Sequence, residues 1–332
     1  MSRLICIILL CSLLGGCTSL DSQPCACDSH KHDLLSQKTL LKWSSSSEDD
    51  KDGDSKKKDE QKKDGQDDKS SEPKDNNKAS AKEETKTDPR SEPLKSDRPD
   101  FTEASTTVGK GVVQLETGYT YTRDHSGINT SASHSYPEAL LRIGMFVDWF
   151  EWRIGQNFSN GRNTGDDNST FHGSEDTYLG IKLALSEQQN CLPELAVIFQ
   201  ATVPTGKDEL TADHILPGIN FLFGWEVIKD KLELGGSFQA NKAANDINQT
   251  YLELAQSITV GYTLTEKLGA FTEWFAIYPS GASFPDVGPQ YYFDGGFTYM
   301  LTKNIQFDIN AGVGLNRHAD DYFVGTGLVV RY

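Results

Sequence analysis

Cysteine is scarce in the body of this chain. Five of the six cysteines lie within the first 27 residues, and only Cys191 lies beyond them. A disulfide framework therefore cannot hold the fold together. Cys25 and Cys27, followed by His30 and His32, have the donor types of a soft-metal site, but a chance cluster is the favoured interpretation. No metal and no cofactor are expected.

Catalytic signatures are also missing. The chain contains no His-Glu-x-x-His, no Gly-x-Ser-x-Gly and no glycine loop that would bind phosphate. The histidines of the body are predicted in loops, where a solvated side chain is the default: His125, His134, His172, His214 and His318. The sequence therefore predicts a protein that is not an enzyme.

The N-terminus lacks the length of a membrane-spanning helix. Its apolar run over 4–14 is too short to cross a bilayer stably. With Arg3 before it and small residues after it, the run predicts a secretory signal over 1–17. The stretch LGGC at 14–17 resembles a bacterial lipobox, so we expect lipidation of Cys17, with an ordinary cleaved signal as the alternative.

Large apolar side chains are almost absent from the stretch that follows. Residues 44–98 hold 17 acidic and 14 basic residues, interleaved along the chain. Such a segment cannot bury enough apolar surface to offset its chain entropy, so we predict a disordered charged tether over 18–96. Because the basic residues are not clustered, nucleic acid is not an expected partner.

From position 112 onward, apolar and polar residues alternate with a period of two, which is typical of strands. In 113–121, for example, Leu115 and Tyr119 share one face, and Gln114 and Glu116 share the other. The pattern predicts strands over roughly 112–122, 136–147, 150–158, 176–185, 194–203, 218–227, 232–241, 250–262, 268–278, 290–301, 305–315 and 322–332.

The connections between these strands alternate in length. Short turns such as DW at 148–149 and TKN at 302–304 follow every second strand, and longer connections rich in Gly, Asn, Asp and Ser follow the others. This alternation is typical of an outer-membrane barrel with short periplasmic turns. The predicted fold is all-β: an antiparallel up-and-down transmembrane β-barrel of about twelve strands over 97–332. Both termini are expected in the periplasm, and membrane lipid is expected around the wall.

The charged residues of the predicted strands all fall opposite the apolar face, which predicts a lumen lined by Glu116, Glu138, Arg142, Glu151, Arg153, Asp176, Lys182, Glu226, Glu233, Glu253, Glu273, Asp294, Asp308 and Arg331. A soluble sandwich would also separate its faces in this way. Two features favour the barrel. Aromatic residues such as Trp152 and Trp274 lie near the strand ends, as interfacial girdles do. Glycines interrupt the charged face, which leaves room inside a lumen.

The chain ends on an aromatic residue, Tyr332, after apolar residues at alternating positions. A closed barrel has no free edge, so the last strand is expected to pair with 112–122. Tyr332 resembles the C-terminal signal that the outer-membrane assembly machinery binds, and this machinery is an expected partner.

Several motifs of 97–332 resemble a known family. They are DRPDFTE at 97–103, GVVQLETG at 111–118, VPTG at 203–206, PGIN at 217–220 and the stretch from DGGFTYM at 294–300 onward. They resemble bacterial outer-membrane proteins named for the meta-pathway of phenol degradation. The resemblance implies a barrel, an outer-membrane location and uptake of small compounds that are aromatic or hydrophobic. The lipobox and the tether are not part of that pattern.

The DRPDFTE motif precedes the first strand and contains Pro99, so it is expected to be extended. Four of its residues could fold into the periplasmic mouth and pair with lumen charges as a gate, or cap the barrel base instead: Asp97, Arg98, Asp100 and Glu103.

The predicted lumen is acidic, with ten carboxylates among its fourteen charged residues. A water-filled pore of this kind would favour cations, whereas a closed barrel would use the same residues as a salt-bridge network. Inward apolar residues could form an apolar path, but packing in a narrowed lumen is the favoured interpretation: Phe146, Ile198, Leu222, Phe271, Phe275 and Ile277.

We therefore predict a transporter or channel for passive movement of small-molecule solutes. The alternative is a non-conducting structural or anchoring outer-membrane lipoprotein. A minor alternative is an outer-membrane lipid-modifying hydrolase, which would need a His and a Ser two residues apart on one strand. His134 instead lies directly beside Ser133 and Ser135.

Overall fold

The computed structural model describes residues 88–332, apart from 166–167, 246–249 and 283–287. The predicted signal, the lipidation site Cys17 and most of the predicted tether lie outside the described residues. Residues 88–96, which the sequence assigned to the tether, are placed against the body of the protein, so the described structure starts before the expected boundary at 97.

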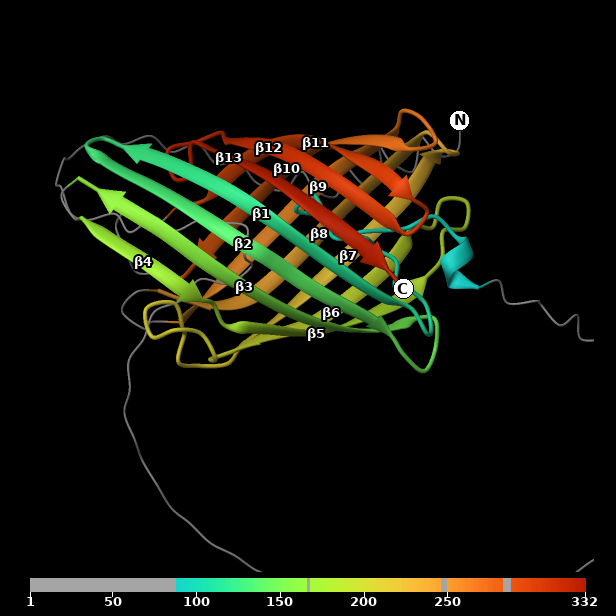
Figure 1. The fold of residues 1–332 in the computed structure, drawn as a ribbon, viewed down its shortest axis with the longest axis horizontal. Helices are drawn as coiled ribbons and strands as arrows, with labels where there is room; N and C mark the ends of the chain where they lie inside the picture. The colour runs from blue at the N-terminus through green and yellow to red at the C-terminus, as the bar shows by residue number, and fades with distance from the viewer. Residues whose placement is uncertain (1–87, 166–167, 246–249, 283–287) are drawn as a thin grey trace, which may run out of the picture.

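Within the described residues, the wall is a closed barrel of twelve antiparallel strands that tilt across its axis (Figure 1). The all-β fold and the strand number expected from the alternation are confirmed. The strands are β1 (Val113–Ser126), β2 (Asn129–Gly144), β3 (Phe150–Thr164), β4 (Ser169–Ser174), β5 (Thr177–Ser186), β6 (Glu194–Val203), β7 (Leu216–Ile228), β8 (Leu232–Ala244), β9 (Thr250–Thr263), β10 (Leu268–Ser280), β11 (Gln290–Thr302), β12 (Ile305–Gly314) and β13 (Tyr322–Arg331). Strand β4 pairs with the end of β3 and runs on into β5, so thirteen labels describe twelve wall strands.

The seam of the barrel joins its first and last strands, as expected from the alternating C-terminus. Strand β1 pairs with β13 from Gln114↔Arg331 to Arg123↔Tyr322, and the Tyr332 N–H donates to the Val113 carbonyl at 2.8 Å. A bilayer offers no water to an unpaired strand edge, so closure satisfies groups that would each cost several kcal/mol. We call the end where β1 starts and β13 ends the terminal end, and the opposite end the loop end.

Two hairpins are longer than the apolar alternation indicated. Strands β1 and β2 continue to a turn at 127–128, and β3 pairs with β4 between Phe158 and Asn163. These parts project past their neighbours at the loop end (Figure 1). The stretch 159–175 was expected to be a loop because it is rich in Gly, Asn and Ser. Backbone pairing beyond the apolar band needs no apolar face, so apolar periodicity could not find it.

The two faces of the wall differ in chemistry. Inward side chains such as Gln114, Glu116 and Glu151 are buried, whereas the outward Ile309 and Phe307 are 45% and 42% exposed. A continuous exposed apolar face of this kind matches a lipid-facing band. Among the described residues, no helix is long and apolar enough to cross a membrane.

The aromatic residues expected at the interfaces lie mostly on the outer surface. Tyr119, Trp152, Phe158 and Phe293 are exposed. Trp225 differs, because its ring packs edge-on against Phe223 at 6.0 Å and is buried there.

A charge placed in the middle of the outer face tests the lipid-facing assignment. Ile309→Lys should lower the free energy of unfolding in lipid vesicles by about 2–4 kcal/mol, because a lysine near the midplane must be desolvated. Ile309→Ala is the matched control and should lower the free energy of unfolding by less. The measurement is urea unfolding followed by tryptophan fluorescence. If the two variants unfold at the same urea concentration, this face does not contact lipid.

Candidate functional site

The chain ahead of β1 folds into the barrel from the terminal end (Figure 1). After the 3-10 helix η1 (Pro89–Ser91), the carbonyls of Arg90 and Glu92 accept hydrogen bonds from Arg331 at 3.2 and 3.0 Å. Residues 97–105 then lie among the inward side chains of the wall. We call residues 97–105 the plug segment.

Asp97 is the electrostatic centre of the plug segment. Its carboxylate lies 2.6 Å from Arg153 Nη1, 2.9 Å from Lys182 Nζ and 3.3 Å from Arg142 Nη1. The three basic side chains come from β3, β5 and β2 and are each 0% exposed. One carboxylate of the plug segment therefore joins three strands of the wall.

Further carboxylates balance the same cations. Arg142 pairs with Glu116 at 3.0 Å and with Glu151 at 2.8 Å. Arg153 pairs with Glu151 at 3.0 Å and with Glu103 of the plug segment. Buried ions are costly unless they are paired and hydrogen-bonded, so these contacts let a charged network persist away from water. The structure thus gathers residues that the sequence predicted separately as lumen and gate.

The ionisation of Asp97 follows from its surroundings. Burial alone would raise its pKa, because burial disfavours the charged form. The cations of Arg142, Lys182 and Arg153 outweigh burial and hold the pKa of Asp97 well below its usual range. This anchor therefore stays charged at physiological pH.

A pair of glycines makes room for the neighbouring Arg98. Gly118 and Gly327 are register partners across the seam, and a Cβ on either would lie within 2.3 Å of the Arg98 side chain. Through this gap the guanidinium reaches Glu138 at 2.8 Å and Asp308 at 3.4 Å. Arg98 therefore fixes the plug segment to the strands beside the seam.

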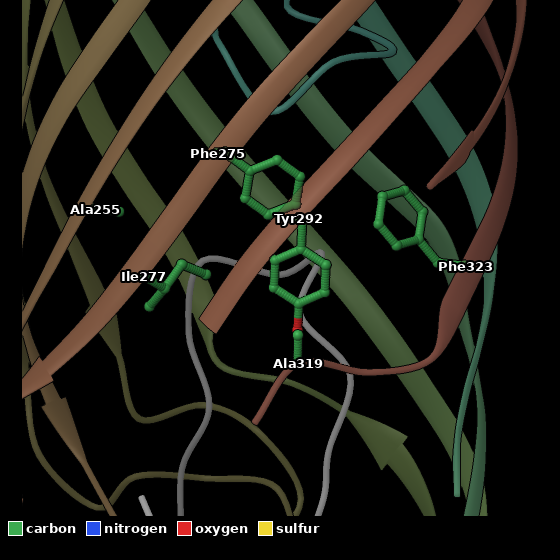
Figure 2. Close-up of a cluster of buried hydrophobic side chains, with 6 residues drawn as sticks. All are labelled: Ala255, Phe275, Ile277, Tyr292, Ala319 and Phe323. Atoms are coloured by element: carbon green, nitrogen blue, oxygen red, sulfur yellow. The ribbon is translucent and has the colours of Figure 1, made fainter. Parts of the chain in front are cut away.

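The tip of the plug segment, residues 100–102, contacts β10. The Glu273 carboxylate accepts hydrogen bonds from Phe101 N at 2.5 Å, Thr102 N at 2.8 Å and Thr102 Oγ1 at 2.5 Å. The Phe101 ring stacks on Phe275, with centroids 4.5 Å apart and planes 3° apart. Phe275 stacks in turn on Tyr292 at 4.7 Å. Figure 2 shows the Phe275 and Tyr292 rings side by side, just beyond the loop of the plug segment.

A second group of carboxylates surrounds this tip. Glu273 and Asp294 are register partners and are 1% and 2% exposed. Asp100 of the plug segment is close enough to interact electrostatically with both carboxylates. Burial, reinforced by the nearby carboxylates of Asp294 and Asp97, raises the pKa of Asp100 to about 7. The tip is therefore sensitive to pH where the Asp97 anchor is not.

Five residues predicted in the lumen lie away from the plug segment. Three of them lie at the rim of the terminal end: Glu226, Glu233 and Arg331. Glu233 is exposed, and its carboxylate lies 2.6 Å from the Nζ of Lys95, which precedes the plug segment. Asp176 and Glu253 lie toward the loop end. Asp176 accepts three backbone N–H groups of the β6–β7 loop at 2.8–3.0 Å, so it organises that loop.

Four expectations about single residues are wrong. Phe146 was expected to point inward, but β2 ends at Gly144 and Phe146 is 66% exposed in the turn that follows. Three histidines expected in loops lie in strands: His125 in β1, His172 in β4, and His134 in β2. The Nδ1 of His134 is 2.7 Å from the Tyr119 hydroxyl. Its strand neighbours two positions away are Ala132 and Tyr136, so β2 supplies no His–Ser pair of the hydrolase type.

Other inward apolar residues lie where the alternation placed them: Ile198, Leu222, Phe271, Phe275 and Ile277 are all buried. Sequence reasoning missed contacts that depend on the path of the chain, such as the hydrogen bond from Ser105 to Glu194 at 2.5 Å. Within the part of the chain that the structure describes, no group of three His, Cys, Asp or Glu side chains is placed to hold a metal ion.

Neutralising Asp97 should loosen the plug segment. Asp97→Asn keeps the shape of the side chain but leaves Arg142, Arg153 and Lys182 short of an anion, which should destabilise the inserted state by about 3 kcal/mol. A glutamyl endopeptidase should then cut after Glu103 much faster than in the wild type. Asp88→Asn removes an exposed ion pair with Arg90 and is the matched control. Equal protection of Glu103 in all three proteins would contradict the anchoring role.

Comparison with solved structures shows the same architecture. The chain is similar to the COG4313 outer membrane channel from Pseudomonas putida F1, with 12% identity, a TM-score of 0.55, and coverage of 71% of this chain and 99% of that one. It also matches the KdgM porin in complex with disordered oligogalacturonate, with 10% identity, a TM-score of 0.41, and coverage of 65% and 98%. At these identities the first likeness shows the fold, and the second carries no further argument.

A third match is the translocator domain of the autotransporter NalP from Neisseria meningitidis, at 10% identity and a TM-score of 0.45, covering 68% of this chain and 89% of that one. None of the curated proteins compared with this chain matches it. A family model, however, matches residues 96–332, which spans the plug segment and the whole barrel. The chain therefore belongs to the family described as "Putative MetA-pathway of phenol degradation".

Proposed function

We propose that this protein is a channel of the bacterial outer membrane for passive movement of small solutes, and that the plug segment closes it. The observation that carries the proposal is the contact of Asp97 with Arg142, Arg153 and Lys182. The plug segment is held by ion pairs and hydrogen bonds and is not a strand of the wall. It can therefore leave the lumen without breaking any pairing between wall strands.

The two ends of the barrel support one orientation in the membrane. Turns at the terminal end are short, such as 229–231 and 303–304, whereas connections at the loop end are mostly longer, such as 204–215 and 315–321. Outer-membrane barrels have short periplasmic turns, so the terminal end, the plug segment and both chain ends are assigned to the periplasm. A lipidated Cys17 with its tether, and Tyr332 as the signal for the assembly machinery, fit this orientation.

Small aromatic compounds are the solutes that the lumen suits best. The stack of Phe101, Phe275 and Tyr292 offers ring surfaces inside the barrel. The description of the family refers to phenol degradation, which is consistent with such solutes. Glu253 and Asp294, with Asp176 toward the loop end, give the remaining path a negative potential that favours cations over anions.

Conductance in planar bilayers tests the channel. The wild type should open rarely, and Asp97→Asn should open at least about tenfold more often, because the inserted plug segment loses its anchor. Asp88→Asn should match the wild type. Cations should carry more of the current than anions.

The competing function is a closed barrel that anchors the tether in the membrane. The complete burial of Arg142, Arg153 and Lys182 favours it, because a permanent structural network keeps its ions away from water. No discrete conductance from folded Asp97→Asn would favour this anchor and sink the channel. Anions that permeate better than cations would refute the acidic path.

The channel should open more readily as the pH rises. The pKa of Asp100 is about 7 in the inserted plug segment and would return to its ordinary value near 4 once solvated. The inserted state is therefore favoured at low pH and loses stability as the pH rises through 7. Open probability should increase about tenfold between pH 6 and pH 8.

Asp100→Asn provides the control for this pH response. It removes one titrating group beside Glu273, Asp294, Asp97 and Thr259, so its open probability should rise less steeply than that of the wild type over the same range. The measurement is single-channel recording at symmetrical salt. An unchanged slope in Asp100→Asn would assign the response to another group.

A further inference from the structure

The tip of the plug segment occupies its position in the lumen as a bound ligand would. The Phe101 ring lies flat against Phe275, while the backbone N–H of the same residue donates to Glu273 at 2.5 Å. Both partners belong to β10 and lie two positions apart, so they face the lumen side by side. The wall thus presents an aromatic face and a carboxylate at a fixed separation.

The occupant has a definite chemical skeleton. In Phe101 the nitrogen is joined to the ring through two carbons, Cα and Cβ, so the group that the wall holds is a 2-arylethylamine unit. Glu273 also takes both donors of Thr102, so its carboxylate is matched to several N–H or O–H donors at once. An ammonium group carries three donors and could replace them together.

Electrostatics favours a cation over a neutral occupant at this place. Glu273 and Asp294 lie side by side on the lumen face of β10 and β11, and both are at least 98% buried. Here the plug segment adds the Asp100 carboxyl, and the donors that it brings to Glu273 are uncharged: the backbone N–H groups of Phe101 and Thr102 and the Thr102 hydroxyl. A ligand ammonium would supply the positive charge that the tip lacks, and the flanking rings would add a favourable cation–π contribution.

Polar atoms around the tip could also form hydrogen bonds with a solute. Asn310 is 5% exposed and donates to the Pro99 carbonyl at 3.3 Å, but its Oδ1 has no hydrogen-bond partner. Ser237 Oγ and Ser257 Oγ lie 2.7 Å apart, and Ser257 Oγ lies 2.6 Å from Thr102 Oγ1. Once Thr102 withdraws, these hydroxyls and the Asn310 oxygen can accept or donate to an incoming solute.

We propose that Phe275, Tyr292 and Glu273 form a lumen site for 2-arylethylammonium cations, and that the tip of the plug segment occupies this site as an internal competitor. The inference deepens the proposed channel function: it names a solute class and gives that class a means of releasing the plug segment. A cation that takes Glu273 and the Phe275 face removes the contacts that hold residues 101 and 102. The solute and the tip cannot occupy the site together.

Direct binding tests the site without requiring conduction. The probes are 2-phenylethylammonium, 2-cyclohexylethylammonium, 2-phenylethanol and 3-phenylpropanoate, titrated calorimetrically into the folded full-length protein in detergent. Phe101→Ala should bind 2-phenylethylammonium at least about tenfold more tightly than the wild type, because its site is no longer occupied. The cyclohexyl amine, the alcohol and the acid should bind more weakly in that order.

Glu273→Gln in the Phe101→Ala background separates the carboxylate from the aromatic face. It should weaken binding of the amine at least about tenfold and leave that of the alcohol nearly unchanged. Phe101→Leu keeps the bulk of the tip without its ring, and it serves if Phe101→Ala fails to fold. In the wild type, the amine should speed cleavage after Glu103, whereas the acid should not.

The outcomes decide both proposals separately. Equal binding of the amine and the alcohol, or no effect of Glu273→Gln, would overturn the site. Binding of the amine without conductance in any variant would keep the site and sink the channel. Conductance in Asp97→Asn without binding of the amine would keep the channel and sink the site.

Discussion

The ion pairs of the Asp97 carboxylate hold the plug segment inside the lumen of this barrel. Arg142, Arg153 and Lys182 face it from three strands, while the wall near them contributes only Glu116 and Glu151. The wall alone therefore has an excess of positive charge in this layer, and the plug segment supplies the missing anions. Because buried ions lose their hydration, the inserted state is favoured by complementarity, and the withdrawn state needs water to enter and solvate the same cations.

The charge of the lumen changes along its axis, and the plug segment is matched to both parts. Near the terminal end it places carboxylates among cations, and at its tip it places N–H donors on Glu273. These two contacts differ in their response to conditions. The Asp97 anchor stays ionised, whereas Asp100 beside Asp294 titrates near neutrality. The segment therefore has one fixed attachment and one adjustable attachment, and only the adjustable one lies against aromatic rings that a solute could use.

The wall could be predicted from the sequence because its cause is local. Period-two alternation defines the strands and their faces, and the bilayer requires closure, so the β1–β13 seam followed from the C-terminal pattern. The site was predicted only in outline: the gate residues were expected to pair with lumen charges, but the sequence did not indicate which charges would meet. Gly118 and Gly327 interrupt the inward face of the sequence pattern. Which side chain fills the gap beside them depends on the pairing of β1 with β13, the first and last strands of the chain. Polar hairpins such as β3–β4 were not predicted, because they have no apolar face that alternation could reveal.

The connection between the plug segment and β1 limits how far the segment would move in the proposed open state. It leads into β1 through 106–112, a connection that at about 3.3 Å per residue reaches no more than roughly 25 Å. The segment can therefore move only as far as this connection allows, and it stays close to the seam that it adjoins. Gly109 and Gly111 in this connection have φ of +83° and +81°, a backbone region open to glycine, and the Gly109 carbonyl lies close over Gly144. In the proposed open state, rotation at these two residues would let residues 97–105 leave the lumen while the strand pairs of the wall, which begin at β1, stay intact.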